Sequence, residues 1–272
     1  MKVSIIVPTR NRSHLVGFTI DSILKQTVRD FELIVVDDCS EDDTEKVVKS
    51  FNDVRIRYFR HDNARLVAAN RNYGMSQAKG EYIAFCDDDD LWLPEKLEKQ
   101  LVEFEKDSTL DMVCSNGVFF NDTGDLGLMY EKSWDNYLTY DIVLKKRPVQ
   151  TSTVVLRKGV IDDIGGMNTD PAFYVHQDYE FWLRITRGEY KILYLDVPLI
   201  RYRRHAAQRH METFSLVTTQ RLKKINSALH TEGLVSHGYY GRRFLWLLTI
   251  ELLIHTRTID VVTRLKRRLR RP

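Results

Sequence analysis

The sequence predicts an α/β fold with a mostly parallel central sheet flanked by helices, followed by a helical, basic C-terminal extension. Two observations lead to this prediction. Four strand-length segments occur in the first 87 residues, and segments whose apolar residues have helical spacing separate them. Strands that alternate with crossover helices are typical of a parallel sheet. The chain has 272 residues, 43% of them hydrophobic, which is enough for one large domain with an appendage.

The predicted strands of this region end in residues that could form a ligand-binding site. Residues 3–8 (VSIIVP) and 31–38 (FELIVVDD) are apolar runs of the kind found in strands buried on both faces. Residues 54–60 alternate like an edge strand, and residues 81–87 form the fourth strand. Ligands of open α/β sheets bind beyond the carboxyl ends of the strands. The residues expected there are Pro8, Thr9, Asp37, Asp38 and the run Asp87–Asp90.

Helices are predicted between these strands, over residues 9–27, 40–51 and 66–80. In the first, Phe18 is one of the residues at helical spacing. In the second, Ser40 has the place of an N-cap, with Asp43 as the acid of a capping box. In the third, Gly80 suits the position just beyond the helix C-terminus.

Beyond residue 93 the pattern is weaker. The predicted helices cover residues 94–107 and 176–188, the predicted strands cover 111–121, 151–158 and 190–205, and residues 122–148 are expected to be irregular. Further helices are predicted over 212–231 and 242–271. We therefore expect one domain over residues 1–210 and a helical, basic extension over residues 211–272.

Charge is distributed unevenly along the chain. Residues 201–272 carry 16 Lys and Arg against 4 Asp and Glu, a net +12, whereas the first 200 residues carry 25 against 34, a net −9. The apolar segment 244–254, followed by basic residues, is typical of a helix at an anionic membrane surface and is too short to cross a bilayer. A helix packed on the main domain, or a dimer contact, would show the same pattern. Nucleic acid is not an expected partner, because no recognition motif accompanies the basic residues.

The three cysteines and the N-terminal segment predict a reducing compartment. Cys39, Cys86 and Cys114 lie far apart and have no metal-ligand spacing. The N-terminal segment lacks the apolar region of a signal peptide. The expected location is therefore cytoplasmic, with peripheral contact to the inner face of the cell membrane through the basic extension.

The four consecutive aspartates of the run Asp87–Asp90 directly follow the fourth strand. In an extended segment alternate side chains point the same way, so Asp87 and Asp89 can present their carboxylates together. Carboxylate oxygens suit Mg²⁺ and Mn²⁺, and Mg²⁺ is commonly held by one or two carboxylates plus substrate phosphates. The run therefore predicts a metal site for a diphosphate. An acidic, solvated loop that caps the helix near Pro94 is the structural alternative.

Five segments, taken together and in order, resemble the motifs of the family 2 glycosyltransferases, which are inverting enzymes of the GT-A fold. The segments are VSIIVPTRNR, SILKQT, FELIVVDDCSEDDT, ANRNYGMSQAKGEYIAFCDDDD and LWLPEKLEKQ. The resemblance is close over residues 1 to about 105 and looser to about 205. It implies a nucleotide-sugar-binding half over residues 1–105 and an acceptor half over residues 106–210.

The resemblance implies roles for residues of the first half. Pro8, Thr9 and Arg10 would frame the nucleotide base. Asp38 would accept a hydrogen bond from a base N–H such as that of uracil, since a carboxylate is only an acceptor. Arg71 would lie near the nucleotide. An N-terminal helix cap is the alternative role for Asp38.

The Asp-x-Asp metal motif of the family corresponds to residues 87–89. It implies that Asp87 lies towards the ribose and the metal, and that Asp89 is the principal metal ligand. Asp88 is a nucleotide-binding candidate, because a shift of one residue would exchange it for Asp87. Asp90 matches the acid that follows and could equally cap the next helix. His205 matches a position near the diphosphate, where it would bind metal or phosphate unless its role is structural.

The segment HQDYEFWLR matches the helix that carries the catalytic base of the family, and Asp178 has the place of that base. Gln177 stands where the family usually has Glu. The alternative for Asp178 is an ordinary first-turn acid, favoured by the helix dipole. His176 would assist at the acceptor or pack, and Trp92 and Trp182 would line the acceptor side or belong to the core.

The function implied by the resemblance is metal-dependent transfer of a sugar, with Mn²⁺ or Mg²⁺ as cofactor. The donor would be a nucleoside diphosphate sugar, with UDP favoured, and the acceptor a hydroxyl of a cell-surface or lipid-linked glycan. A sugar nucleotidyltransferase is a second class, but it would need a glycine-rich loop, which VPTRNRSH lacks. A catalytically silent regulator that binds nucleotide sugars is a third class. Gln177 favours it, whereas the presence of Asp87, Asp89 and Asp178 together argues against it.

Overall fold

A computed structural model describes residues 2–63, 65–131, 136–170, 173 and 176–205, and a few isolated residues between 227 and 241. The chain divides into two compact units, Met1–Arg204 and His205–Pro272. The helices predicted over 212–231 and 242–271 lie outside the described residues, apart from those isolated positions. Within the part of the chain that the structure describes, no helix is both long and apolar enough to cross a bilayer.

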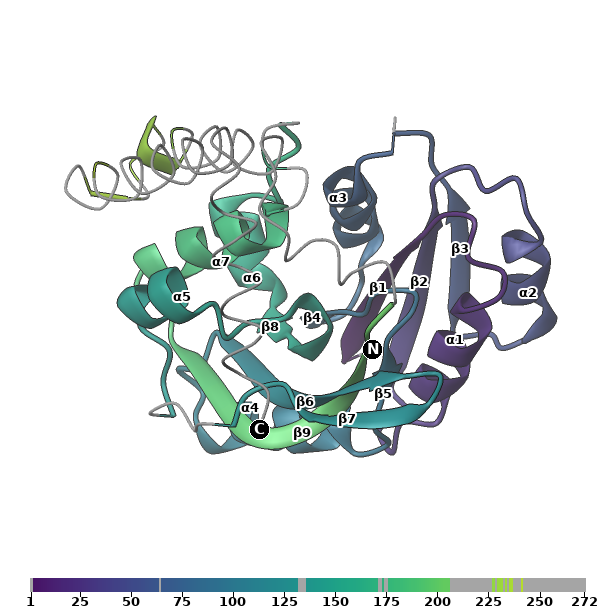
Figure 1. Cartoon of the computed structure of the whole chain (residues 1–272), viewed down its shortest axis with the longest axis horizontal. Helices are drawn as coiled ribbons and strands as arrows, with labels where there is room; N and C mark the ends of the chain where they lie inside the picture. Colours follow the sequence, from purple (N-terminus) through teal and green to yellow (C-terminus); the bar gives the residue numbers. More distant parts are fainter. Residues whose placement is uncertain are drawn as a thin grey trace, which may run out of the picture. The chain divides into compact units, whose positions relative to one another are not determined.

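The first unit is built on one mixed sheet whose first half is parallel, as the sequence predicts (Figure 1). The strand order is β3-β2-β1-β4-β8-β6-β9-β5, and β7 pairs with β6. The parallel strands are β1 (Val3–Thr9), β2 (Phe31–Asp37), β3 (Ile56–Arg60) and β4 (Tyr82–Phe85). β3 lies at the edge, which confirms the prediction from its alternating sequence. The carboxyl ends of β1, β2 and β4 therefore lie at the same edge of the sheet.

Helices cover both faces of these strands. Because the side chains of a strand alternate between its faces, neighbouring residues of β1 pack against different helices. Val7 belongs to the same core cluster as residues of α1 (Val16–Leu24). Ile6 faces the other way, towards α3 (Val67–Gln77), where a Cβ on Gly74 would lie 2.5 Å from Ile6 Cγ2. A strand buried on both faces needs a continuous apolar sequence, which β1 has.

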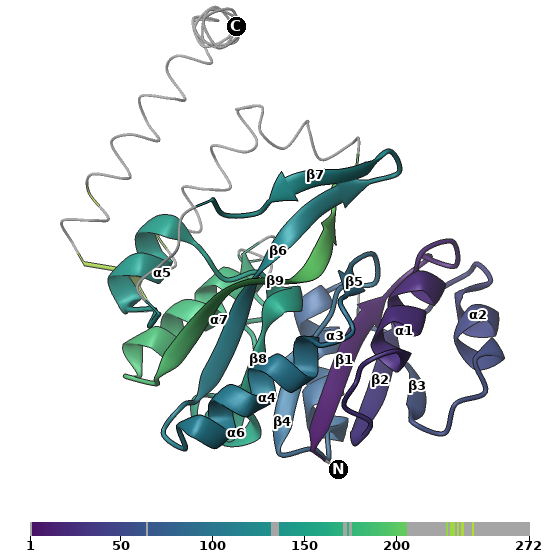
Figure 2. The ribbon, with the colours of Figure 1, turned by 90° about the horizontal axis from the view of Figure 1, so that it is seen from below.

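The second half of the sheet is mostly antiparallel. β8 (Val155–Arg157) pairs antiparallel with β4 and with β6 (Met112–Asn121), and β6 runs parallel to β9 (Ile192–Arg203). β5 (Leu91–Trp92) pairs with β9, so the segment that follows the aspartate run is tied to the far edge of the sheet. The hairpin of β6 and β7 (Gly124–Leu128) extends beyond the rest of the sheet (Figure 2).

Of the remaining helices, α2 (Thr44–Ser50) contacts α1 and belongs to the parallel half. The second half is flanked by α4 (Lys96–Lys106), α5 (Tyr140–Lys146), α6 (Lys158–Ile164) and α7 (Gln177–Arg187). Residues 122–148 are thus not irregular throughout, because β7 and α5 form there. The segment 151–158 is only partly a strand, since a 3-10 turn, η1 (Thr151–Thr153), precedes β8. β7 depends on pairing with β6, a contact that local periodicity does not reveal.

Phe18 lies in α1 as predicted, although its side chain is 63% exposed and α1 buries Val16, Ile20 and Ile23. Two local predictions were wrong. Ser40 does not cap a helix: α2 begins four residues later, and Ser40 lies in the loop that follows β2. Gly80 is not a helix terminus. It is required because a Cβ there would lie 2.6 Å from the backbone nitrogen of Ser4.

Lys96, the first residue of α4, is fully buried. Its Nζ donates a hydrogen bond to Gln100 Oε1 at 2.6 Å and lies 4.0 Å from the centroid of the Trp92 ring. Burial disfavours the charged ammonium and lowers the pKa of Lys96 to about 7, although Cys86 and Cys114 act in the opposite direction. A core lysine of this kind makes stability depend on pH.

Lys96→Met is expected to remove this pH dependence. Between about pH 7 and about pH 10 the unfolded chain, in which lysine keeps its ordinary pKa of 10.5, binds more protons than the folded protein. The contribution of Lys96 to the free energy of unfolding therefore rises with pH across this window, by at most about 1.4 kcal/mol per pH unit. Denaturant unfolding of both proteins over this range measures it. A difference between wild type and variant that does not change with pH would contradict the lowered pKa.

Candidate functional site

The end of β2 holds two adjacent carboxylates with different surroundings. Asp37 is buried and accepts hydrogen bonds from Tyr58 Oη at 2.5 Å and from the N and Oγ of Ser40 at 2.8 and 2.6 Å. Asp38 Oδ2 lies 3.2 Å from Arg10 Nη1. Asp38 Oδ1 is buried and has no hydrogen-bond partner among the described residues. Because buried acceptors normally have a donor, Asp38 Oδ1 is suited to a ligand N–H.

The residues predicted to frame a nucleotide base are neighbours in the structure. Pro8 and Thr9 are buried at the end of β1, which pairs with the end of β2. The backbone N of Asp38 donates to Thr9 O at 2.9 Å. Asp38 does not cap α2, which begins at Thr44 after its N-cap residue Asp43. The helix-cap alternative for Asp38 is therefore wrong.

The first two aspartates after β4 have cationic or hydroxyl partners. Asp87 Oδ1 accepts a hydrogen bond from Nη2 of the buried Arg71 at 2.5 Å. Asp88 Oδ2 accepts one from Thr9 Oγ1 at 2.7 Å. Burial, together with the charges of Asp87 and Asp89, raises the pKa of Asp88 to about 7. Arg71 and Asp88 thus both lie at the edge of the sheet where the sequence predicts the nucleotide.

Asp90, the last aspartate of the run, faces the interior. It is 1% exposed, and its Oδ2 accepts from Ser152 Oγ at 2.6 Å while its Oδ1 accepts from Arg203 N at 2.9 Å. It does not cap the next helix, because the N-cap residue of α4 is Glu95. Asp90 is therefore a structural residue whose buried hydrogen bonds fix the position of the loop that follows β4.

Asp87 and Asp89, the two acids of the predicted metal motif, are both partly exposed. Among the described residues, no three His, Cys, Asp or Glu side chains are grouped as a complete metal site. Two carboxylates fit the type of Mg²⁺ or Mn²⁺ site that ligand phosphates complete. The donor set therefore fits a cation bound together with a diphosphate. His205 is the first residue of the second compact unit, and its metal-binding role stays a prediction.

Asp178, in the first turn of α7, is held by a hydroxyl. Thr151 Oγ1 donates to Asp178 Oδ2 at 3.1 Å. Burial raises the pKa of Asp178, as does the charge of Asp87, whereas Arg71, the Tyr179 backbone N–H and the Thr151 hydroxyl lower it. Arg71 therefore acts electrostatically on the predicted base and is paired with Asp87. A half-buried carboxyl with a raised pKa is suited to proton transfer.

The other residues predicted for the acceptor side are buried or pack against protein side chains. Gln177 is buried, and His176, at the N-cap position of α7, meets the Tyr179 ring edge-on. Trp92 and Trp182 are 3% and 1% exposed, so both belong to the core. Neither tryptophan is placed to form an exposed wall for an acceptor.

Three hydroxyl residues that contact the site carboxylates were not predicted from the sequence. They are Tyr58, which bonds Asp37, and Thr151 and Ser152, which bond Asp178 and Asp90. The signal for the last two was the sequence TST, three consecutive hydroxyl residues at the start of a segment expected to be a buried strand. Buried hydroxyls need partners, so such a run indicates a polar network.

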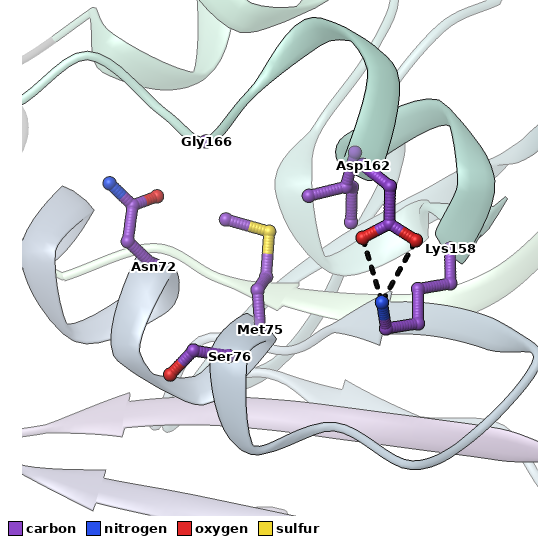
Figure 3. Close-up of a pocket in the computed structure, with 7 residues that line it drawn as sticks. Asn72, Met75, Ser76, Lys158, Asp162 and Gly166 are labelled. Carbon is purple, nitrogen blue, oxygen red and sulfur yellow. Dashed lines mark hydrogen bonds and ion pairs between the residues drawn. The ribbon is translucent and has the colours of Figure 1, made fainter.

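A separate pocket of about 300 Å³ lies between α3 and α6. Its lining residues are Asn72, Met75, Ser76, Lys158, Ile161, Asp162 and Gly166 (Figure 3). None of the predicted nucleotide, metal or catalytic residues lines it. The charged pair that it contains, Lys158 and Asp162, is joined by hydrogen bonds of 2.7 and 2.9 Å. The pocket therefore offers no uncompensated charge to a ligand.

Comparison with known proteins matches residues 4–165 to the family described as glycosyl transferase family 2. The chain is 33% identical over 186 residues to the Escherichia coli UDP-Glc:alpha-D-GlcNAc-diphosphoundecaprenol beta-1,3-glucosyltransferase WfgD, covering 68% of this chain and 70% of that protein. It is 30% identical over 252 residues to the E. coli enzyme of the same description named WfaP, covering 88% of this chain and 97% of that one.

Two solved structures share the fold. S. aureus TarS 1-349 in complex with UDP-GlcNAc has a TM-score of 0.67 and 21% identity, covering 92% of this chain and 72% of that one. The mannosyltransferase PcManGT from Pyrobaculum calidifontis, in complex with GDP-Man and Mn2+, has a TM-score of 0.66 and 18% identity, covering 92% and 73%. Both confirm the predicted GT-A type of sheet and helix arrangement.

A thiol reagent is expected to modify one cysteine of the native protein. Cys39 is half-buried in the loop after β2, whereas Cys86 and Cys114 are buried, and burial raises the pKa of both thiols. Mass spectrometry after brief treatment with iodoacetamide should show one adduct, and Cys39→Ser should show none. Adducts on Cys86 or Cys114 in the folded protein would contradict the packing of β4 and β6.

Proposed function

The chain belongs to glycosyl transferase family 2 and is a glycosyltransferase, and on this premise we propose that it transfers one sugar from a UDP-sugar, with inversion, to a lipid-linked glycan. The observation that carries the proposal is the position of Arg71. It is paired with Asp87 in the donor region and acts on the carboxyl of Asp178. A donor diphosphate and a general base would thus work side by side.

The donor base would bind at the ends of β1 and β2. Asp38 Oδ1, which is buried and has no partner among the described residues, would accept the N3–H of uracil. Thr9 and Arg10 would frame the ring, and Arg71 and Asp88 would lie along the ribose and diphosphate. The names of the relatives WfgD and WfaP specify UDP-glucose, which makes UDP-glucose the first donor to test.

The donor diphosphate would bind at Asp87 and Asp89 together with Mn²⁺ or Mg²⁺, and His205 is a further proposed ligand. A divalent cation bound there would supply charge neutralisation on the diphosphate as it leaves. Asp90 would not ligate the cation, because Ser152 and the Arg203 backbone N–H already bond its two oxygens.

Asp178 would act as the general base. As the acceptor oxygen attacks the anomeric carbon, its proton would pass to an Asp178 carboxylate oxygen, and the bond from that carbon to the diphosphate oxygen would break. Attack opposite to the leaving group inverts the configuration. The raised pKa of Asp178 strengthens it as a base, and the Thr151 hydroxyl would hold one of its oxygens in place. Nucleoside diphosphate and the glycosylated acceptor are the products.

The acceptor we propose is a sugar carried on a lipid diphosphate. WfgD and WfaP are named for an acceptor in which GlcNAc is linked through diphosphate to undecaprenol. Residues 201–272, with a net charge of +12, would bring the chain to an anionic membrane surface where such an acceptor resides. The enzyme would then act at the cytoplasmic face as a peripheral protein.

Titration calorimetry with UDP, GDP and dTDP, each with and without Mn²⁺, tests the donor site. UDP is expected to bind best and only with Mn²⁺, and Asp89→Ala should weaken this binding at least about tenfold, because it removes a carboxylate from the cation. Asp21→Ala, which removes an exposed carboxylate on α1, is the matched control and should bind like wild type. Equal binding without Mn²⁺, or full binding by Asp89→Ala, would overturn the proposed metal site.

Asp178→Asn is expected to lower kcat by about 100- to 10,000-fold while leaving the affinity for UDP and Mn²⁺ unchanged, because only the proton acceptor is lost. Transfer from UDP-glucose to a synthetic GlcNAc diphosphate lipid, followed by NMR of the new linkage, measures rate and stereochemistry. Asp141→Asn removes a first-turn acid of α5 and should have no effect. Undiminished turnover by Asp178→Asn would exclude it as the base, and a retained anomeric configuration would exclude inversion.

A further inference from the structure

η1, the 3-10 turn Thr151–Thr153, touches two parts of the site that are far apart in the chain. Thr151 Oγ1 donates to Asp178 Oδ2 at 3.1 Å. The next residue, Ser152, donates through Oγ to Asp90 Oδ2 at 2.6 Å, and the same Oγ accepts the backbone N–H of Asp87 at 3.0 Å. The turn therefore contacts both ends of the aspartate run and the predicted base.

The orientation of the Ser152 hydroxyl is fixed by these two bonds. Its one proton is given to Asp90, and its lone pair receives the Asp87 N–H. Asp90 is held a second time by the Arg203 backbone N–H and a third time through its own carbonyl, which accepts from Thr19 Oγ1 at 2.9 Å. The loop that carries Asp87 and Asp89 is thus pinned at both ends.

The turn is itself anchored in the core. Thr151, Ser152 and Thr153 are 4%, 0% and 1% exposed. Ser152 O accepts from Trp92 Nε1 at 3.1 Å, and Thr153 O accepts from Gln100 Nε2 at 2.8 Å. A buried network in which the groups are bonded in this way is rigid, because any shift leaves a polar group without a partner.

We propose that Thr151 and Ser152 are positioning residues that set the distance between the catalytic carboxylate of Asp178 and the loop that binds the donor diphosphate. The proposal rests on the proposed function. Ser152 acts on the donor loop, whereas Thr151 orients the Asp178 carboxylate towards the acceptor hydroxyl. Small displacements of reacting groups cost large factors in rate, so a turn that fixes both groups controls turnover.

Substitutions of Thr151 and of Ser152 should therefore have different effects on UDP affinity and on kcat. Ser152→Ala leaves Asp90 Oδ2 and the Asp87 N–H without these partners, so we expect UDP to bind about tenfold more weakly with Mn²⁺ and kcat to fall as well. Thr151→Val keeps the size of the side chain. We expect its UDP affinity to stay within about twofold of wild type and its kcat to fall about tenfold. Thr151→Ser, which restores the hydroxyl, should recover most of the lost kcat.

The controls are buried hydroxyls bonded only to the backbone in the described structure. Ser115→Ala matches Ser152→Ala, because Ser115 donates to Asn116 O, and Thr186→Val matches Thr151→Val, because Thr186 donates within α7. Both controls should bind UDP and turn over like wild type. Ser152→Cys is the milder variant if Ser152→Ala does not fold, and we expect a smaller loss of UDP affinity in the same direction.

The assays are calorimetry with UDP and Mn²⁺, and transfer from UDP-glucose to the GlcNAc diphosphate lipid. A wild-type protein that neither binds UDP nor transfers sugar would overturn the proposed function and the positioning role with it. If the wild type is active, either of two results would overturn the positioning role alone. One is a kcat of Thr151→Val equal to that of Thr186→Val, and the other is full UDP affinity in Ser152→Cys. A loss of kcat in Thr151→Val that Thr151→Ser does not recover would overturn the role of the Thr151 hydroxyl, because packing and not the hydrogen bond to Asp178 would then account for the loss.

Discussion

The concentration of carboxylates at the carboxyl ends of two parallel strands, β2 and β4, is the constraint on which the site depends. Two unit charges about 5 Å apart repel by roughly 0.8 kcal/mol even in water, and by more where they are removed from it. Six aspartates follow β2 and β4 at this edge. The protein tolerates them because partners from several elements neutralise or bond them: Arg10, Arg71, Thr9, Tyr58 and Ser152.

These partners also divide the aspartates by role. Asp37 and Asp90 have their oxygens bonded by protein groups, and they support the loops. Asp38 keeps one buried oxygen that lacks a partner in the described structure, and Asp87 and Asp89 stay partly exposed. The second group, together with Asp88, which is also partly exposed, is available to a nucleotide and a cation. A sequence run of identical residues is thus resolved into distinct functions by the donors around it.

The interior behind the site contains buried polar side chains that are linked to one another. Lys96 bonds Gln100, Gln100 bonds the carbonyl of Thr153, and the next residue back, Ser152, bonds Asp90. Such a chain is stable only while each member has its partner, because a lost partner leaves a desolvated group. The network therefore connects the packing of α4, in the core, to the position of the donor loop.

The sequence by itself determined the parallel half of the sheet and the residues at its strand ends. Continuous apolar runs, acids directly behind them and helical spacing between them are local patterns, and each depends on neighbours only a few residues away. The same patterns identified Asp38, Asp87 and Asp89 as candidates, whereas Arg71 and Asp178 were identified through the resemblance to a family. Their proposed roles follow from residue type and from the resemblance to a family.

Only the tertiary structure decided which partner each candidate has. Ser152 and Asp90 are 62 residues apart in the chain, and Thr151 and Asp178 are 27 apart. Lys96, on an amphipathic helix, would be placed in solvent by its residue type but lies in the core. β7 likewise forms only against β6. Contacts of this kind form when distant segments pack together, so their geometry is not encoded in any local pattern of residues.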